Sequence, residues 1–150
     1  MSSQLSALYT ELVIEHDKRP QHAGLRDPFD TEVHHVNPTC GDEITLRLHL
    51  TDDEQIEDLS YEAIGCAMSR ASASIMADLL IGHSVEEMDP VRAHFEEVMR
   101  SRGRLEGDED LIGDGIALLG AAKFPGRVKC VLMPWKAYQA ALVEARALRG

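Results

Sequence analysis

The segment at residues 43–53, EITLRLHLTDD, alternates apolar and polar side chains from Ile44 to Leu50. Because successive side chains of a strand point to opposite faces, this alternation predicts a β-strand with one buried and one solvated face. Two further strand patterns flank it, TEVHHV at 31–36 and QIEDLSYEAIG at 55–65, each separated from it by a short connection. The sequence therefore predicts a small meander of three antiparallel strands.

A helix is predicted before this meander, over residues 3–20. The segment SQLSALYTELVIEHDKRP places apolar residues at helical spacing, carries basic residues near its end and stops at Pro20. Its predicted apolar stripe consists of Leu5, Leu8, Leu12 and Val13.

More helical patterns follow the meander. They predict helices at 66–83 and 84–101, a charged, Gly-rich loop at 102–115, a short helix at 116–124, a break at 125–127 and a final helix at 128–150. Ser84 and Glu87 have the spacing of a capping box at the start of their helix. Trp135 lies on the apolar stripe of the final helix, which predicts core packing. This order of elements predicts an α+β fold with helices covering one face of an antiparallel sheet.

Length and composition suit one domain over residues 1–150. A chain of this length, with 44% hydrophobic and 27% charged residues, can bury a substantial core. The start of the chain lacks a basic segment followed by an apolar run, and no stretch reaches the length of a membrane span, so we expect a cytoplasmic protein that is not inserted in a membrane. The net charge of −11 argues against nucleic acid as a partner and predicts that protein partners offer a basic patch.

Three cysteines lie at predicted element boundaries, and an odd number cannot pair fully within one chain. Cys40 lies in the turn between the first two strands, Cys66 between the third strand and its helix, and Cys130 at the predicted start of the final helix. Helix starts favour thiolate over thiol, and Gly41 allows a sharp turn that directs Cys40 and Asp42 at a common centre. If the sheet brings these segments together, the four side chains would surround a metal of zinc or iron–sulfur type. Burial of each cysteine as a small apolar residue is the alternative, since the sequence contains no CxxC pair.

Three separated motifs, NPTCGDEITL, GCAMSRASASIM and RVKCVLMPWKA, resemble the signature of the SufU and IscU family of iron–sulfur cluster assembly proteins. The opening LYTELVIEHDKRPQHAG is similar to the start of that family, so the resemblance extends over nearly the whole chain. It implies a three-stranded antiparallel sheet with helices packed against it. It also implies four zinc ligands, Cys40, Asp42, Cys66 and Cys130.

Two features resemble the SufU type more than the IscU type. Lys129 precedes the third cysteine, where the IscU type has a histidine, and residues 99–115 look like the insertion that distinguishes the SufU type. The resemblance therefore implies a zinc-dependent sulfurtransferase that accepts persulfide sulfur from a SufS-type cysteine desulfurase, itself a pyridoxal-phosphate enzyme. We expect Cys40, on the mobile turn, to leave the metal and take up the sulfur, while the other three ligands retain zinc.

Alternatives remain at this point. An IscU-like scaffold would use the same cysteines to hold an iron–sulfur cluster, and a purely structural zinc site would have no chemistry. Arg127 and Lys129 either balance the charge of the site and steer a persulfide or are solvated surface residues. His34 and His35 point to opposite faces of their strand, so at most one could approach the metal.

Overall fold

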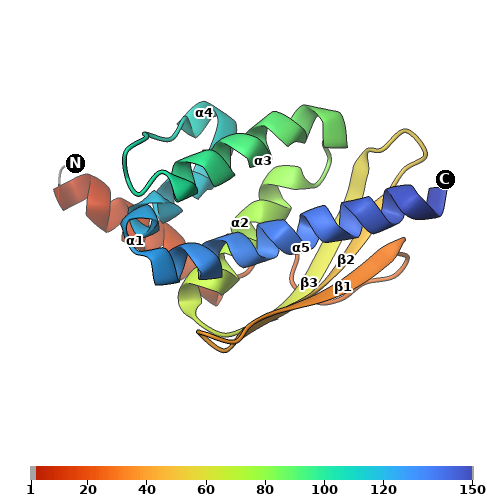
Figure 1. Ribbon diagram of the computed structural model, residues 1–150, viewed down its shortest axis with the longest axis horizontal. Coiled ribbons are helices and arrows are strands. Elements are labelled where there is room, and N and C mark those ends of the chain that lie inside the picture. The colour runs from red at the N-terminus through yellow and green to blue at the C-terminus, as the bar shows by residue number, and fades with distance from the viewer. Residues whose placement is uncertain (1–2, 150) are drawn as a thin grey trace.

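The computed structural model describes residues 3–149 as a three-stranded sheet with a layer of helices packed on it (Figure 1). The elements, in chain order, are α1 Ser3–Lys18, β1 Thr31–Asn37, β2 Asp42–Leu50, β3 Ile56–Ile64, α2 Ala67–Leu80, α3 Val85–Arg100, α4 Glu109–Ile112, the 3₁₀ helix η1 Gly113–Lys123 and α5 Pro125–Arg149. None of the described helices combines the length and the apolar character that a membrane crossing requires.

The sheet is an antiparallel meander in the order β1-β2-β3, which confirms the predicted fold class. Along β2 the even-numbered residues from Asp42 to Leu50 are buried, and the residues between them are half-buried. All helices lie on one side of the sheet, with α5 crossing it lengthwise (Figure 1). The alternation in the sequence thus directs the apolar face of β2 toward the helices.

A buried polar contact joins α2 and α5 within the helix layer. Trp135 is fully buried and stacks on Phe95 with ring centroids 4.5 Å apart, which confirms the predicted core role of the tryptophan. Its Nε1 donates to Ser72 Oγ at 3.1 Å, and the Ser72 hydroxyl donates to the carbonyl of Val131 at 2.6 Å. A small hydroxyl residue on α2 therefore lets α5 approach closely and satisfies two of its polar groups.

The predicted loop at 102–115 is wrong beyond Asp108. Asp108 caps α4, since its side chain accepts from the N–H of Asp110, and η1 follows at once. Ile112 and Leu118 are fully buried, and a side chain at Gly115 would begin 3.3 Å from Phe95 on α3. Packing against α3 therefore orders a segment whose charge and glycine content predict a loop.

The final helix begins earlier than predicted. Residues 125–127 are its first turn, because proline is well tolerated at the first position of a helix, where its missing N–H has no partner. Cys130 consequently lies in the second turn of α5 and not at a helix start.

The first helix is confirmed, but its predicted stripe is only partly correct. Leu12 and Val13 are half-buried, whereas Leu8 is 50% exposed; the side chain of Leu5 lies outside the described residues. Among the side chains described on this helix, at residues 7–18, the buried one is His16, which bonds Ser74 of α2 at 2.7 Å and Asp114 of η1 at 2.8 Å.

Candidate metal centre

Asp42 is the first residue of β2 and is fully buried, which is unusual for a carboxylate. Its Oδ1 accepts from the backbone N–H of Cys66 at 2.8 Å, which joins the start of β2 to the start of α2. Gly65 makes room for this contact: a Cβ there would lie 2.0 Å from Asp42 Oδ1. One carboxylate oxygen is thereby fixed by the backbone, and the second, Oδ2, is directed toward the cysteines.

Cys40 lies in the exposed turn between β1 and β2. The N–H groups of Cys40 and Gly41 both donate to the carbonyl of Asn37, at 3.3 and 2.9 Å. Gly41 has φ +73, a left-handed conformation that glycine adopts without a steric penalty. This geometry places Cys40 and Asp42 on the same side of the turn, with their ligand atoms in one cluster.

Cys130 approaches this turn from α5 and is buried. Its Sγ lies 3.0 Å from Cys40 Sγ, 3.6 Å from the carbonyl of Gly126 and 3.7 Å from Asn37 Nδ2. The pKa of the Cys130 thiol is raised well above its ordinary value. Burial is the largest cause, and the hydrogen bonds with Asp42 and Cys40 act in the same direction. Without a cation at this place, the thiolate form of Cys130 is disfavoured.

Cys66 lies beside this group, at the start of α2. It is the N-cap residue of α2 and is half-buried, so it lies at the predicted boundary between the third strand and its helix. Its Sγ lies 3.8 Å from both Asp42 Oδ2 and Ser69 Oγ. The ligand atoms of Cys40, Asp42 and Cys130 all lie within 4.8 Å of one another, a group that does not include Cys66.

The donor set fits a zinc ion. Zinc prefers four tetrahedral ligands with Zn–S bonds of about 2.3 Å, which corresponds to sulfur–sulfur separations of about 3.8 Å. The Cys40 and Cys130 sulfurs, 3.0 Å apart, are the pair that would have to separate slightly, and the exposed turn of Cys40 permits this. Three free cysteines and one buried carboxylate are also groups that a divalent cation would hold in their charged forms.

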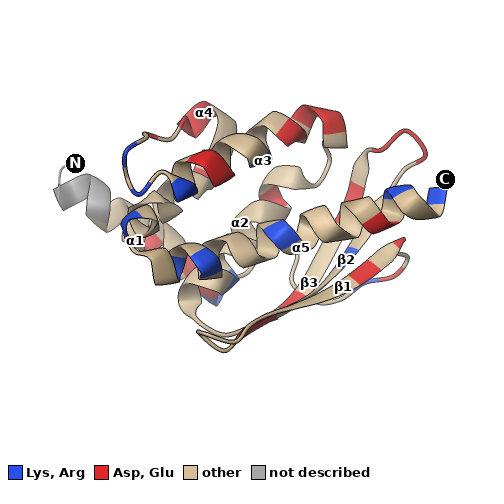
Figure 2. Ribbon diagram, viewed as in Figure 1, with Lys and Arg blue, Asp and Glu red and all other residues tan. Residues whose placement is uncertain are grey.

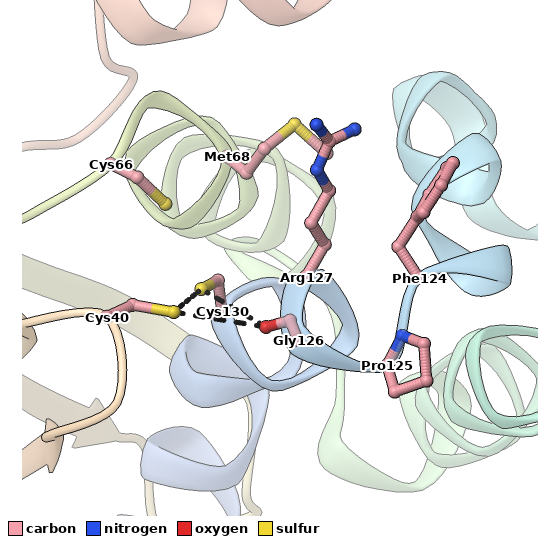
Figure 3. A pocket seen from close by; sticks show the side chains of 8 residues that line it. All are labelled: Cys40, Cys66, Met68, Phe124, Pro125, Gly126, Arg127 and Cys130. Carbon is pink, nitrogen blue, oxygen red and sulfur yellow. Dashed lines mark hydrogen bonds between the residues drawn. The ribbon is translucent and has the colours of Figure 1, made fainter.

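A cavity of about 400 Å³ opens directly beside the cysteines (Figure 3). Met68 and Arg127 form one part of its wall, and Phe124, which stacks against the Arg127 guanidinium at 4.9 Å, forms another. The structure thus brings Arg127 to the cysteine cavity. It places Lys129 elsewhere, in a separate cavity beside His34 and His35.

Several supporting residues were not identified from the sequence. Asn37 contacts Cys130, Gly65 accommodates Asp42, and Arg70 donates to the Gly65 carbonyl at 2.8 Å while pairing with Asp17 of α1. Asn37 stands in the motif NPTCGDEITL and Gly65 in GCAMSRASASIM, but nothing in their spacing indicates that they meet the candidate ligands.

Comparison with known proteins gives concordant results. The family model of the NifU-like N-terminal domain matches residues 8–131. A protein of Streptococcus pyogenes serotype M1 named iron–sulfur cluster assembly scaffold protein IscU is 39% identical over 140 residues, which cover 93% of this chain and 86% of the relative. The zinc-dependent sulfurtransferase SufU of Bacillus subtilis is 36% identical over 140 residues, covering 92% of this chain and 91% of the relative.

Solved structures agree with the fold. A crystal structure described as an iron–sulfur cluster assembly scaffold protein for the SUF system, from Fervidobacterium islandicum, is 31% identical with a TM-score of 0.80 and covers 94% of this chain and 99% of its own. A NifU-like N-terminal protein from Brucella abortus has a TM-score of 0.83 at 20% identity, a likeness of fold alone.

Proposed function

Since the chain belongs to the NifU-like N-terminal domain family, with relatives named IscU and SufU that serve iron–sulfur cluster assembly, we propose that it is a zinc-dependent sulfurtransferase. Its sulfur donor would be a SufS-type cysteine desulfurase, and Cys40 would be the acceptor. A relative that is 36% identical over nearly the full chain carries the name of this activity.

The observation that carries the proposal is the difference in exposure among the clustered groups. Cys40 is exposed on a turn, whereas its neighbours Asp42 and Cys130 are buried in the sheet and in α5. A turn can move with little loss of core packing, while a buried residue on a helix or strand cannot. Cys40 is therefore the thiol that can meet a partner, and the buried groups are the ones suited to remain in place.

Sulfur transfer needs no oxidant in this arrangement. The Cys40 thiolate attacks the outer sulfur of the donor's persulfide, R–S–SH, and a new S–S bond forms at Cys40 Sγ as the donor's own S–S bond breaks. The donor cysteine departs as a thiolate, so that charge, atoms and electrons balance. The Arg127 guanidinium in the cavity wall supplies a positive charge beside the negative charge that passes from Cys40 to the donor sulfur.

Asp42, Cys66 and Cys130 would hold the zinc together with Cys40 in the resting protein. Zinc, when bound, keeps its sulfur ligands as thiolates and contributes no redox chemistry of its own. The chain's own contribution is the positioning of Asp42, which the Cys66 N–H fixes at one oxygen and Gly65 admits at close range.

A cluster scaffold is the second candidate function. The cavity of about 400 Å³ borders all three cysteines, and the relative from Streptococcus pyogenes is named a scaffold. Cysteine thiolates are also the usual ligands of iron–sulfur clusters. Lys129, in place of the histidine typical of the IscU type, supports the sulfurtransferase.

Metal analysis with an optical spectrum separates the two candidates. The sulfurtransferase should contain one zinc per chain and be colourless, since zinc has a filled d shell. A brown protein with stoichiometric iron and sulfide that survives purification in air would support the scaffold instead.

An activity assay then tests Cys40. Adding the protein to its desulfurase and cysteine should raise alanine production, Cys40→Ser should abolish the increase, and Thr39→Ala, a change at the adjacent exposed position of the same turn, should retain it. Equal stimulation by Cys40→Ser and the parent would refute the proposed role of this thiol.

A further inference from the structure

The outer edge of β1 is open. β1 pairs with β2, and, apart from the turn contacts at the Asn37 carbonyl, the isolated bridges and loop hydrogen bonds of residues 3–149 give it no other backbone partner. The opposite edge differs, because Ala23 bridges to Tyr61 of β3 and Gly24 N–H donates to the Tyr61 carbonyl at 2.8 Å. An open edge strand presents unpaired N–H and C=O groups on alternate residues, which is a template for another strand.

A cavity of about 440 Å³ lies between this edge and α5. Its lining includes His34, His35 and Val36 of β1, and Lys129, Met133 and Lys136 of α5. His35 is on the face of β1 that is turned toward the helices, whereas His34 and Val36 are exposed on the opposite, solvent-facing side of the sheet. Residues from both faces of the strand and from the helix thus surround a space along the strand edge.

The charge of this cavity is opposite to that of the whole chain. Residues 125–143 of α5 contain Arg127, Lys129 and Lys136 and no acidic residue, although the net charge is −11. Figure 2 shows basic residues on this part of α5, while acidic residues gather on α3 and on the β2–β3 connection. Among the ion pairs of the described residues, none uses Lys129 or Lys136. Both cations are therefore available to a partner's carboxylates.

We propose that the β1 edge and the adjacent side of α5 form a docking groove for an acidic, extended segment of the sulfur-donating partner, which adds a fourth strand beside β1. The inference rests on the proposed function for the identity of the partner. Main-chain hydrogen bonds to β1 would supply the pairing, and every second side chain of the added strand would point toward α5. Although the net charge favours basic partners, this groove selects an acidic one.

The spacing of the two lysines defines the sequence of the occupant. Lys129 and Lys136 are seven residues apart, which is about 10 Å along a helix, and side chains on one face of a strand repeat every 7 Å or so. Carboxylates two or four residues apart on the added strand can therefore reach both ammonium groups. The groove selects a short, alternating acidic and apolar segment, with Met133 between the two lysines on the helix.

The position of the groove explains how such a segment would serve the cysteine site. β1 ends at Asn37, whose carbonyl accepts from the turn that carries Cys40, and its amide contacts Cys130. A strand paired along β1 would therefore finish at the turn of the acceptor thiol. Docking there sets the distance between the donor's persulfide and Cys40.

Hydrogen–deuterium exchange on the zinc-loaded protein, alone and with the desulfurase from the same organism, tests the proposal. Amides within 31–37 should exchange more slowly in the complex, because the added strand engages them. Lys136→Glu should lower the affinity of the complex at low salt by ~10-fold or more. Lys136→Arg, which keeps the positive charge, should bind like the parent protein. Lys123→Glu is the matched control: it makes the same charge change on η1, outside the groove, and should leave the affinity unchanged.

The outcomes separate this inference from the proposed function. If sulfur reaches Cys40 while the exchange of 31–37 is unaltered, with protection absent or confined to α1 and η1, the docking groove is wrong and the sulfurtransferase stands. If 31–37 is protected but no sulfur reaches Cys40, the groove stands and the proposed function fails. Equal weakening by Lys136→Glu and Lys123→Glu would show a general charge effect and overturn the groove.

Discussion

Gly65→Ala should disrupt the cysteine site although it replaces none of the proposed metal ligands. The new Cβ would lie 2.0 Å from Asp42 Oδ1 and 2.9 Å from Asp42 Cα, so no side-chain rotation of the aspartate alone can relieve the overlap. Gly65 also has φ +137, a backbone conformation that other residues rarely adopt. Asp42 must therefore move away from the N–H of Cys66.

Two effects lower the free energy of unfolding of the Gly65→Ala variant. Losing the hydrogen bond from Cys66 N–H to a buried carboxylate costs ~1.5–3 kcal/mol. Holding a residue other than glycine in a sparsely populated backbone region costs ~1–3 kcal/mol. A combined loss of ~2.5–6 kcal/mol corresponds to a fall in melting temperature of at least ~5 °C for a domain of this size.

Calorimetry and zinc analysis of the same samples provide the test. Gly82→Ala is the matched control, since Gly82 also has a positive φ of +89 but has nothing within 4 Å of a new Cβ. The control should lose some stability and keep its zinc, whereas Gly65→Ala should lose both. Equal melting temperatures and equal zinc contents in the two variants would refute the close-contact argument.

Three further predictions concern metal, charge and core. Chelation of zinc, or Asp42→Ala, should lower the melting temperature and the zinc content together, because the proposed ligands come from separate elements; an unchanged melting curve after chelation would make the site peripheral. A hydrogen bond from Arg26 lowers the pKa of Asp58 in the folded protein. The ionised Asp58 carboxylate therefore stabilises the fold above the ordinary carboxyl pKa, and this contribution is lost as the pH falls through the lowered pKa. Asp58→Asn should therefore destabilise the protein at pH 7 but not in strong acid, and a pH-independent difference in urea denaturation would contradict this. Ser72→Ala should cost ~1–3 kcal/mol in urea denaturation by leaving Trp135 Nε1 without its partner, and a neutral result would contradict that role.

The sheet could be predicted from sequence because its information is local. The alternation from Ile44 to Leu50 defines both the strand and its buried face. The helical structure of residues 109–123 depends instead on burial of Ile112 and Leu118 in the core, among helices that lie far away in the sequence and that local composition does not encode. The sequence predicts a break at Pro125 because a proline fits both the end of one helix and the first turn of the next.

The candidate site, too, could be predicted only in part from the sequence. The turn of Cys40 and Asp42 could be recognised because Gly41 lies between them in the sequence. The roles of Asn37 and Gly65 depend on the register of the strands, in which Asn37 is opposite Asp42 and Gly65 follows the end of β3. Those roles require the three-dimensional structure, since neither residue type is by itself a ligand or a nucleophile.

Mass spectrometry of the zinc-loaded protein after incubation with its desulfurase and cysteine tests the central claim most directly. Rapid alkylation at the end of the reaction should trap one added sulfur atom on the peptide that contains Cys40, with Cys66 and Cys130 unmodified. An added sulfur that maps only to Cys66 or Cys130, or no added sulfur while iron and sulfide accumulate on the protein, would contradict the assignment of Cys40 as the sulfur acceptor.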